Sequence, residues 1–190
     1  MASRVCRAQE RSSVFLIGYR GSGKSSVGRL LAEKLGCAFS DTDRMVEEAI
    51  GSSISEYFRQ AGEPAFRARE SEALAEIAGA AAAGSRRVAA TGGGIVLNLA
   101  NIEAMRRAGV VVWLVASAAT LRQRILADAA SAASRPALQG SSSADEVEAV
   151  LRQREPLYRA AADFEVLTEG RGAEEIAGEI LRRIEILFRP

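Results

Sequence analysis

The sequence predicts an α/β fold, a three-layer sandwich in which five parallel strands form a sheet between helices. Short apolar runs rich in β-branched residues alternate with longer segments of helical periodicity along the chain. Strands separated by helices pair in parallel, because each crossover needs a helix to return the chain to the same end of the sheet. The run VVVWLV at 110–115 is apolar throughout, which is typical of a strand covered on both faces.

The first half of the chain shows this alternation in order. VFLIG at 14–18 predicts a buried strand, and KSSVGRLLAEKLG at 24–36 has helical spacing that ends at a glycine. A short strand is expected near CAFSD, 37–41, and RVAAT at 87–91 predicts a third strand that stops at the run GGG. Helical patterns lie between these two strands, at 43–50, 54–61 and 64–83.

The second half repeats the pattern around one unusual segment. Helical periodicity over 99–108 leads into the strand at 110–115, and a further helix is expected at 118–128. The stretch 127–144 is rich in alanine and serine and is too long for an ordinary connection, so it is either a mobile lid or a disordered segment. The last expected elements are a helix, a strand and a helix, at 145–161, 164–168 and 173–187.

The length and composition indicate one globular domain, which we place at 14–190, after a short disordered lead at 1–13. Of the 190 residues, 26% are charged and 48% hydrophobic, and the formal net charge is +1, which gives no reason to expect nucleic-acid or membrane partners. No window approaches the roughly 18 apolar residues of a membrane span. The N-terminus has no apolar signal core, although the stub of a trimmed transit peptide is an alternative to a disordered lead. We expect a monomer.

The residue types that are missing restrict the chemistry. The chain contains no histidine, which excludes a Ser–His triad, imidazole acid–base catalysis and a histidine-ligated metal. Cys6 and Cys37 lie in no paired motif, so we expect a reducing, cytoplasmic compartment rather than a disulfide framework or a zinc site. Any catalysis must therefore use carboxylates, lysine, arginine, hydroxyls, backbone amides or a metal held by oxygen.

The stretch GYRGSGKSS, which follows the first strand, predicts a phosphate-binding loop. Gly18 to Ser25 fits the pattern G-x-x-x-x-G-K-[ST] with a strand before it and an amphipathic helix after it. Successive backbone N–H groups and the helix N-terminus would face one anion; Lys24 would neutralise the β- and γ-phosphates, and the Ser25 hydroxyl would bind Mg²⁺. The alternative is a glycine-rich turn with a solvated lysine. The expected nucleotide-binding residues of this segment are Gly21, Ser22, Gly23, Lys24, Ser25 and Ser26.

Two aspartates follow the second strand, in the run SDTD. Ligands of open α/β sheets bind at the carboxyl ends of the strands, so Asp41 and Asp43 should lie beside the phosphate loop. A carboxylate at this point can hold Mg²⁺, directly or through water, or accept a proton from an attacking hydroxyl. The alternative is that Asp43 only caps the following helix.

Two further clusters predict the other half of the site. In FRARE, Arg67 and Glu70 are three residues apart on a helix, so the glutamate can hold the arginine in place to bind a carboxylate; the alternative is a surface salt bridge. In TGGG, three glycines follow a strand from Thr91 onward, which is understandable where backbone approaches a ligand closely. A plain turn is the alternative.

Taken together, these motifs resemble the shikimate kinases. The loop GYRGSGKS, DTD, FRxxE, GGG, the RP of a lid and REPLY occur in the order and approximate spacing of that family, from residue 14 onward. The resemblance implies a P-loop fold of the nucleoside-monophosphate-kinase type with strand order 2-3-1-4-5. It also implies transfer of the γ-phosphoryl group of ATP to the 3-hydroxyl of shikimate, with Mg²⁺, in the pathway to chorismate and the aromatic amino acids.

The same resemblance implies roles for individual residues. Asp43 would bind the shikimate hydroxyls and is the candidate base, while Asp41 would help to hold Mg²⁺ beside Ser25. Arg124 would stack on adenine, and Arg135 would close over the transferring phosphoryl group. The expected catalytic residues are Lys24, Asp43 and Arg135. The expected acceptor pocket consists of Asp43, Arg67, Gly92, Gly93, Gly94 and Arg154.

Two departures from the family pattern concern the lid, which has RPAL where RPLL is commoner and a longer, alanine-rich segment before it. Two rival functions are a gluconate kinase, or another small-metabolite kinase on this fold, and a kinase-like module that senses ligands. The combination of FRxxE, GGG and REPLY favours shikimate as the acceptor, and intact Lys24, Ser25 and Asp43 favour an enzyme.

Overall fold

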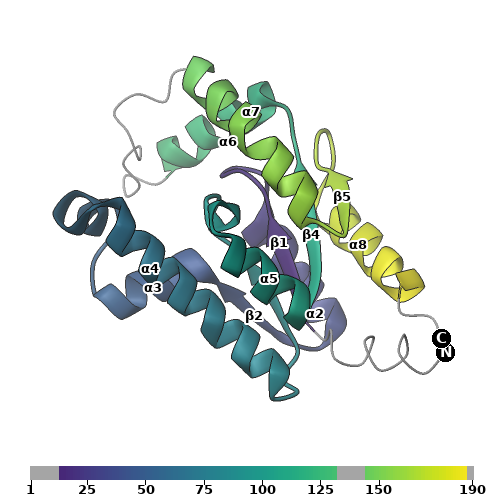
Figure 1. Cartoon of the computed structure of the whole chain (residues 1–190). Coiled ribbons are helices and arrows are strands. Elements are labelled where there is room, and N and C mark those ends of the chain that lie inside the picture. The colour runs from purple at the N-terminus through teal and green to yellow at the C-terminus, as the bar shows by residue number, and fades with distance from the viewer. Residues whose placement is uncertain (1–12, 132–143, 188–190) are drawn as a thin grey trace.

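The computed structural model describes residues 13–131 and 144–187, which form one five-stranded parallel sheet surrounded by helices (Figure 1). The strand order is β2-β3-β1-β4-β5, so the predicted fold class and order are confirmed. The strands are β1 (Ser13–Ile17), β2 (Ala38–Asp41), β3 (Arg87–Ala90), β4 (Gly109–Val115) and β5 (Phe164–Leu167). The helices are α2 (Lys24–Leu35), α3 (Thr42–Ile50), α4 (Ile54–Ala82), α5 (Leu99–Ala108), α6 (Ala118–Ser131), α7 (Ala144–Ala161) and α8 (Ala173–Leu187).

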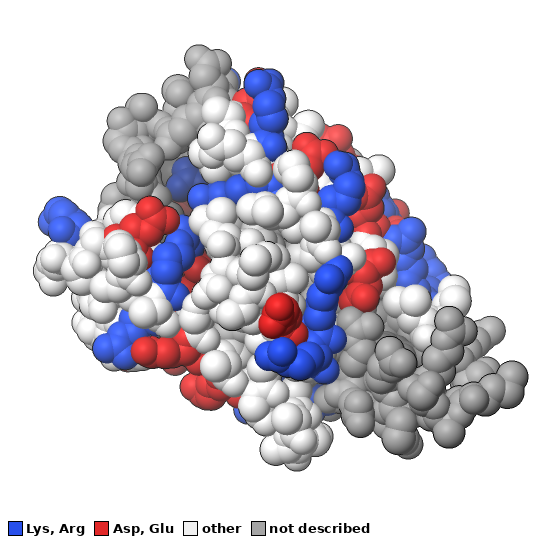
Figure 2. Space-filling view, in the orientation of Figure 1, with Lys and Arg blue, Asp and Glu red and all other residues white. Residues whose placement is uncertain are grey.

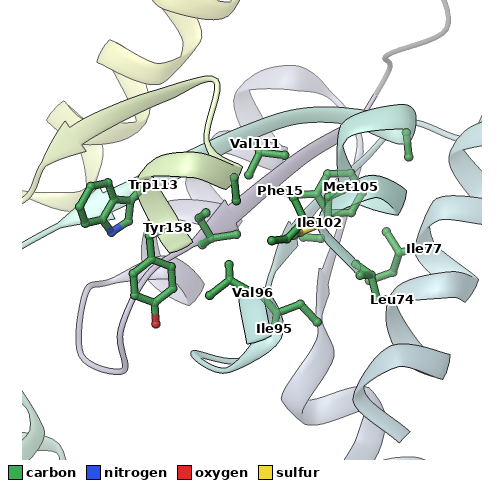
Figure 3. Packing of buried hydrophobic residues seen from close by; sticks show 14 of the residues in the cluster. Phe15, Leu74, Ile77, Ile95, Val96, Ile102, Met105, Val111, Trp113 and Tyr158 are labelled. Atoms are coloured by element: carbon green, nitrogen blue, oxygen red, sulfur yellow. The ribbon is translucent and has the colours of Figure 1, made fainter. Parts of the chain in front are cut away.

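Alternating residues of the central strands fill a separate core on each face of the sheet. Phe15 and Ile17 of β1 point to one face, where α4, α5 and α7 cover them (Figure 3). Val14 and Leu16 point to the other face, which α2 and α8 cover. This alternation follows from the period of two along a strand. Burial on both faces explains why β4 is apolar throughout and why β1 is apolar from Val14 to Ile17.

The register brings the carboxyl ends of the strands to one edge of the sheet. In β1, Leu16 lies beside Ala90 of β3 and Val112 of β4, and β2 pairs with β3 so that Asp41 lies beside Ala90. The segments that leave these strands carry the phosphate loop, the two aspartates and the glycine run. The parallel order thus places the motifs of the sequence at a common edge.

The ends of the helices follow local sequence signals. Helix α2 ends at Gly36, whose φ of 60° lies in the left-handed region, as expected for a glycine after a helix. Helix α4 is continuous from Ile54 to Ala82 except at Gly62, whose φ of 81° and ψ of 171° interrupt the helical geometry. The two helices predicted at 54–61 and 64–83 therefore meet at this break, just before Pro64.

Two features were not predicted, and one expectation lies outside the described residues. A short 3₁₀ helix at Ile95–Leu97 follows the glycine run, and α6 continues to Ser131 where the prediction ended at 128. Most of the expected lid, 127–144, and all of the expected lead except residue 13 fall on residues that the structure does not describe.

On the face shown in Figure 2, basic and acidic residues surround a largely uncharged centre. Among the described helices, none has the length and apolar character needed to cross a membrane.

Candidate functional site

The phosphate loop connects β1 to α2 and curls at glycines that no other residue could replace without strain. Gly18 has a φ of 138°, and a Cβ at this position would lie only 2.6 Å from the carbonyl oxygen of Leu114. Gly23 has a φ of 91° and is the residue before α2. These conformations turn the chain sharply, so that the N-terminus of α2 faces the carboxyl edge of the sheet.

Lys24 is buried in this loop and points its ammonium group at backbone carbonyls. Its Nζ donates hydrogen bonds to the oxygens of Gly18 and Tyr19, both at 2.8 Å, and its side chain is almost fully enclosed. Burial lowers the pKa of Lys24 to about 8, although the nearby carboxylates of Asp43 and Asp41 oppose this shift. A desolvated cation of this kind is available to an incoming polyphosphate.

Ser25 and Asp41 bring two oxygens together beside the loop. The Ser25 hydroxyl donates a hydrogen bond of 2.7 Å to Oδ2 of Asp41. The other oxygen of Asp41, Oδ1, accepts from the backbone N–H groups of Asp43 and Arg44, so Asp41 is the N-cap of α3. The capping role that we considered for Asp43 is therefore wrong: Asp41 caps this helix.

Gly92 lies where two carboxylates converge. A Cβ at Gly92 would be 2.4 Å from Oε1 of Glu70 and 2.7 Å from Oδ1 of Asp43, so only a glycine fits between them. The backbone N–H of Gly92 donates to the buried hydroxyl of Thr42, at 2.9 Å. Burial raises the pKa of Glu70, and Arg67 and Arg154 only partly offset this effect. Glu70 of α4 and Asp43 of α3 thus approach the segment after β3 at the same residue, Gly92.

Arg67 is held between two glutamates and against Gly94. Its Nη1 donates to Oε2 of Glu70 at 2.8 Å, as the spacing in FRARE predicted, and its Nε and Nη2 donate to one oxygen of Glu63 at 3.2 and 3.1 Å. Burial lowers the pKa of Arg67, but the two glutamates outweigh it and the pKa is raised. A Cβ at Gly94 would lie 2.1 Å from Nη1 of Arg67, so this glycine makes room for the guanidinium.

Arg154 approaches the same glycine run from α7. Its Nη1 donates to the carbonyl oxygen of Gly93 at 3.2 Å, and the hydroxyl of Tyr158 donates to the same oxygen at 2.5 Å. The ring of Tyr158 stacks on Trp113 in the core, as Figure 3 shows, and burial raises the pKa of its hydroxyl to about 12. Tyr158 therefore stays a hydrogen-bond donor and anchors the wall that carries Arg154.

A cleft of about 390 Å³ lies over the phosphate loop and reaches from Asp43 to the loop after β5. Arg124 of α6 lines it, and its two terminal nitrogens donate to the hydroxyl and the carbonyl of Thr168, at 3.0 and 2.7 Å. The lining includes Asp43, the candidate base, and most of the residues that the sequence predicted for the nucleotide and the metal: Gly21, Ser22, Gly23, Lys24, Ser25, Ser26, Asp41 and Arg124.

The structure thus places the predicted residues around one edge of the sheet, with one exception. Arg135 lies outside the described residues. Sequence reasoning missed Glu63, whose position four residues before Arg67 was a usable signal. It also missed Thr168 and Arg171, which follow β5 and line the cleft, although the rule that located the aspartates applies equally to this strand.

Comparison with protein families finds a match over most of the chain. Residues 20–185 match the family model described as Shikimate kinase. A shikimate kinase of Symbiobacterium thermophilum is 42% identical over 173 residues, which cover 91% of this chain and 96% of that protein. A shikimate kinase of Moorella thermoacetica is 46% identical over 168 residues, with 88% and 91% covered.

A solved structure agrees with these sequence relatives. Shikimate kinase from Acinetobacter baumannii in complex with shikimate superposes with a TM-score of 0.83 at 33% sequence identity. The superposition covers 95% of this chain and 96% of that chain, so the similarity extends over the sheet, its helices and the edge where the cleft lies.

Proposed function

The chain belongs to the shikimate kinase family, and we propose that its residues transfer the γ-phosphoryl group of ATP to the 3-hydroxyl of shikimate as follows. The observation that carries the proposal is the two-sided site. Lys24 of the phosphate loop and Asp43 line one cleft together with Gly93, and the guanidiniums of Arg67 and Arg154 contact the same glycine run at Gly94 and Gly93. This arrangement suits a polyphosphate donor and a small acceptor that carries both a carboxylate and hydroxyls.

On the donor side, the loop binds the phosphates of ATP. The backbone amides of Gly21 to Ser26 face the β-phosphate, and Lys24 exchanges its bonds with the loop carbonyls for bonds with the β- and γ-phosphates. This exchange requires no large movement, because the ammonium group already lies inside the loop, against the carbonyls of Gly18 and Tyr19. Lys24 then stabilises the negative charge that develops as the bond from the γ-phosphorus to the leaving oxygen lengthens.

The oxygens beside the loop fit a magnesium ion. Mg²⁺ prefers hard oxygen ligands and commonly keeps several waters, so one hydroxyl and one carboxylate beside a phosphate site are sufficient protein ligands. The Oγ of Ser25 and the Oδ2 of Asp41, which lie 2.7 Å apart, provide this pair. When bound, Mg²⁺ neutralises charge on the β- and γ-phosphates, and Ser25 would hold it directly while Asp41 would hold it through water.

On the acceptor side, Arg67 and Arg154 bind the carboxylate of shikimate. Arg67 is already oriented by Glu70 and Glu63, which use three of its five N–H groups and leave one on each terminal nitrogen. Arg154 contacts Gly93 of the same glycine run through its Nη1. Two oriented guanidiniums bind one carboxylate strongly and fix the direction of the ring. The Acinetobacter baumannii relative was solved with shikimate bound, which supports this choice of acceptor.

Asp43 lies between the two sides and receives the proton. The shikimate hydroxyl donates a hydrogen bond to the Asp43 carboxylate, and as the oxygen attacks the γ-phosphorus its proton passes to Asp43 while ADP leaves. Positioning and charge supply most of the rate enhancement in phosphoryl transfer, so the absence of histidine is no obstacle. Arg124 would contact the adenine, and Arg135 would close over the transferred group from the lid; closure excludes water as a competing acceptor.

A coupled assay of ADP release tests the proposal. The wild-type chain should release ADP with shikimate and Mg²⁺ and show little release with gluconate at the same concentration. The Lys24→Ala variant serves as the control for contaminating kinases. Release with gluconate but not with shikimate would contradict the choice of acceptor. Binding of both nucleotide and shikimate without turnover would instead favour a ligand-sensing module.

A further inference from the structure

Arg20 lies inside the phosphate loop, and neither the sequence motif nor the proposed mechanism uses its side chain. The pattern G-x-x-x-x-G-K-[ST] leaves this position unspecified. In the structure Arg20 lines the cleft together with Lys24, Asp43 and Gly93. A guanidinium at this place adds a third arginine to a site that already contains two on the acceptor side.

The Nε atom of Arg20 is buried without a partner. Among the described residues, only Glu70 and Arg87 also carry a buried side-chain nitrogen or oxygen that makes no hydrogen bond. Both of these side chains are anchored by another atom, Glu70 by Arg67 and Arg87 by Ser40. No hydrogen bond or ion pair joins the Arg20 side chain to another residue in 13–131 or 144–187. An unpaired buried donor of a cationic group is costly, so it calls for a partner that binds later.

The position of Arg20 indicates what that partner is. Its backbone nitrogen lies 3.5 Å from the place that a Cβ on Gly93 would occupy, so the loop after β1 packs directly on the loop after β3. The carbonyl of Gly93 in turn accepts a hydrogen bond from Arg154. Arg20 therefore lies at the seam between the phosphate loop and the wall of the acceptor pocket. The cleft beside it also contains Asp41 and Asp43, whose charges an anionic ligand has to overcome.

We propose that the Arg20 guanidinium binds an anionic group of the bound substrates at this seam, either the phosphoryl group being transferred or the carboxylate of the acceptor. The inference rests on the proposed function, because that function supplies both anions. Arg20 then acts as an additional binding residue for the reaction, and its unpaired Nε is the donor that the ligand satisfies. The phosphoryl group and the carboxylate would both accept hydrogen bonds from the guanidinium. The ligands that lose affinity in an Arg20 variant show which of the two anions it binds.

Calorimetric titration of four ligands tests the proposal: ADP, ATP, shikimate and shikimate 3-phosphate. The variants are Arg20→Gln, Arg20→Lys, which keeps the charge without the planar donor group, and Arg182→Gln, a control on the exposed face of α8. If Arg20 binds the transferred group, Arg20→Gln weakens ATP and shikimate 3-phosphate about tenfold and spares ADP and shikimate. If it binds the carboxylate, shikimate and shikimate 3-phosphate weaken about tenfold and both nucleotides are spared.

Other results overturn the proposal. Affinities for all four ligands within about twofold of the Arg182→Gln control would show that Arg20 binds no substrate anion. Equal loss for all four ligands, together with a lower melting temperature in both Arg20 variants, would assign Arg20 a structural role instead. Turnover of the wild-type chain distinguishes a failure of the Arg20 proposal from a failure of the proposed function. Turnover with shikimate supports the proposed function whatever the Arg20 variants show, and its absence contradicts that function.

Discussion

Replacing Gly94 with alanine should damage the acceptor pocket and leave the nucleotide cleft intact. The added methyl carbon would lie 2.1 Å from Nη1 of Arg67, 2.5 Å from its Cζ and 2.6 Å from its Nη2. Optimal contacts between carbon atoms are about 3.5–4.0 Å, so the guanidinium has to move by about 1 Å or more. That movement pulls Nη1 away from Glu70, whose buried carboxylate orients it.

The size of the effect follows from the contacts that are lost. A hydrogen bond to a charged group is worth about 1.5–3 kcal/mol, which corresponds to a factor of about 10–100 in affinity. Displacing a positioning group by about 1 Å can cost about 100-fold in rate. We therefore expect the KM for shikimate to rise about 10- to 100-fold and the KM for ATP to stay within about twofold of wild type.

Steady-state kinetics with each substrate varied in turn measures this effect, with two controls. Gly79→Ala lies on the exposed side of α4, where a Cβ would meet nothing within 4 Å, and should change neither KM. The double variant Gly94→Ala/Arg67→Ala should resemble Arg67→Ala alone, because the alanine acts only through the guanidinium. An unchanged KM for shikimate in Gly94→Ala, or full additivity in the double variant, would refute the reasoning.

The remaining predictions concern the other parts of the site. Lys24→Ala should lower kcat by orders of magnitude with little change in melting temperature, and near-normal turnover would contradict its role at the phosphates. Burial holds the pKa of Lys24 at about 8, and bound phosphates would raise this pKa, so ADP binding above pH 8 should take up a proton and weaken as the pH rises. Calorimetry in two buffers of different ionisation enthalpy measures the proton uptake, and an ADP affinity that does not change with pH would contradict the prediction. Asp41→Asn should raise the Mg²⁺ concentration needed for half-maximal turnover, and an unchanged Mg²⁺ dependence would remove Asp41 from the metal site. Arg135→Ala should reduce kcat more than nucleotide affinity, and the reverse result would misplace the lid.

The fold could be predicted almost completely, because its signals are local. Apolar strands and amphipathic helices alternate, and helix ends such as Gly36 are marked by single residues. The strand order needed the resemblance to a family, since periodicity does not say which strands are neighbours. The short 3₁₀ helix at Ile95–Leu97 was missed, because only Ile95 and Val96 enter the core and three residues are too few to show a period of their own.

The site could be predicted where its residues follow strands or lie three apart on a helix. Asp41, Asp43 and the pair of Arg67 with Glu70 were found in this way. Contacts between segments that lie far apart in the sequence could not be predicted. Tyr158 meets Gly93 across 65 positions of sequence, and Arg20 gains its significance only because the loops after β1 and β3 pack together. Such contacts depend on the tertiary arrangement and leave no pattern in a single sequence.

A crystal structure of the chain with ADP, Mg²⁺ and shikimate is the sharpest test of the proposed arrangement of phosphate loop, Asp43 and the two arginines. We expect the shikimate carboxylate to lie within hydrogen-bond distance of the guanidiniums of Arg67 and Arg154. We also expect the 3-hydroxyl to contact Asp43 and to face the terminal phosphate of ADP across the cleft. A shikimate molecule bound with its carboxylate away from both arginines, or with no hydroxyl directed at the phosphate loop, would contradict it.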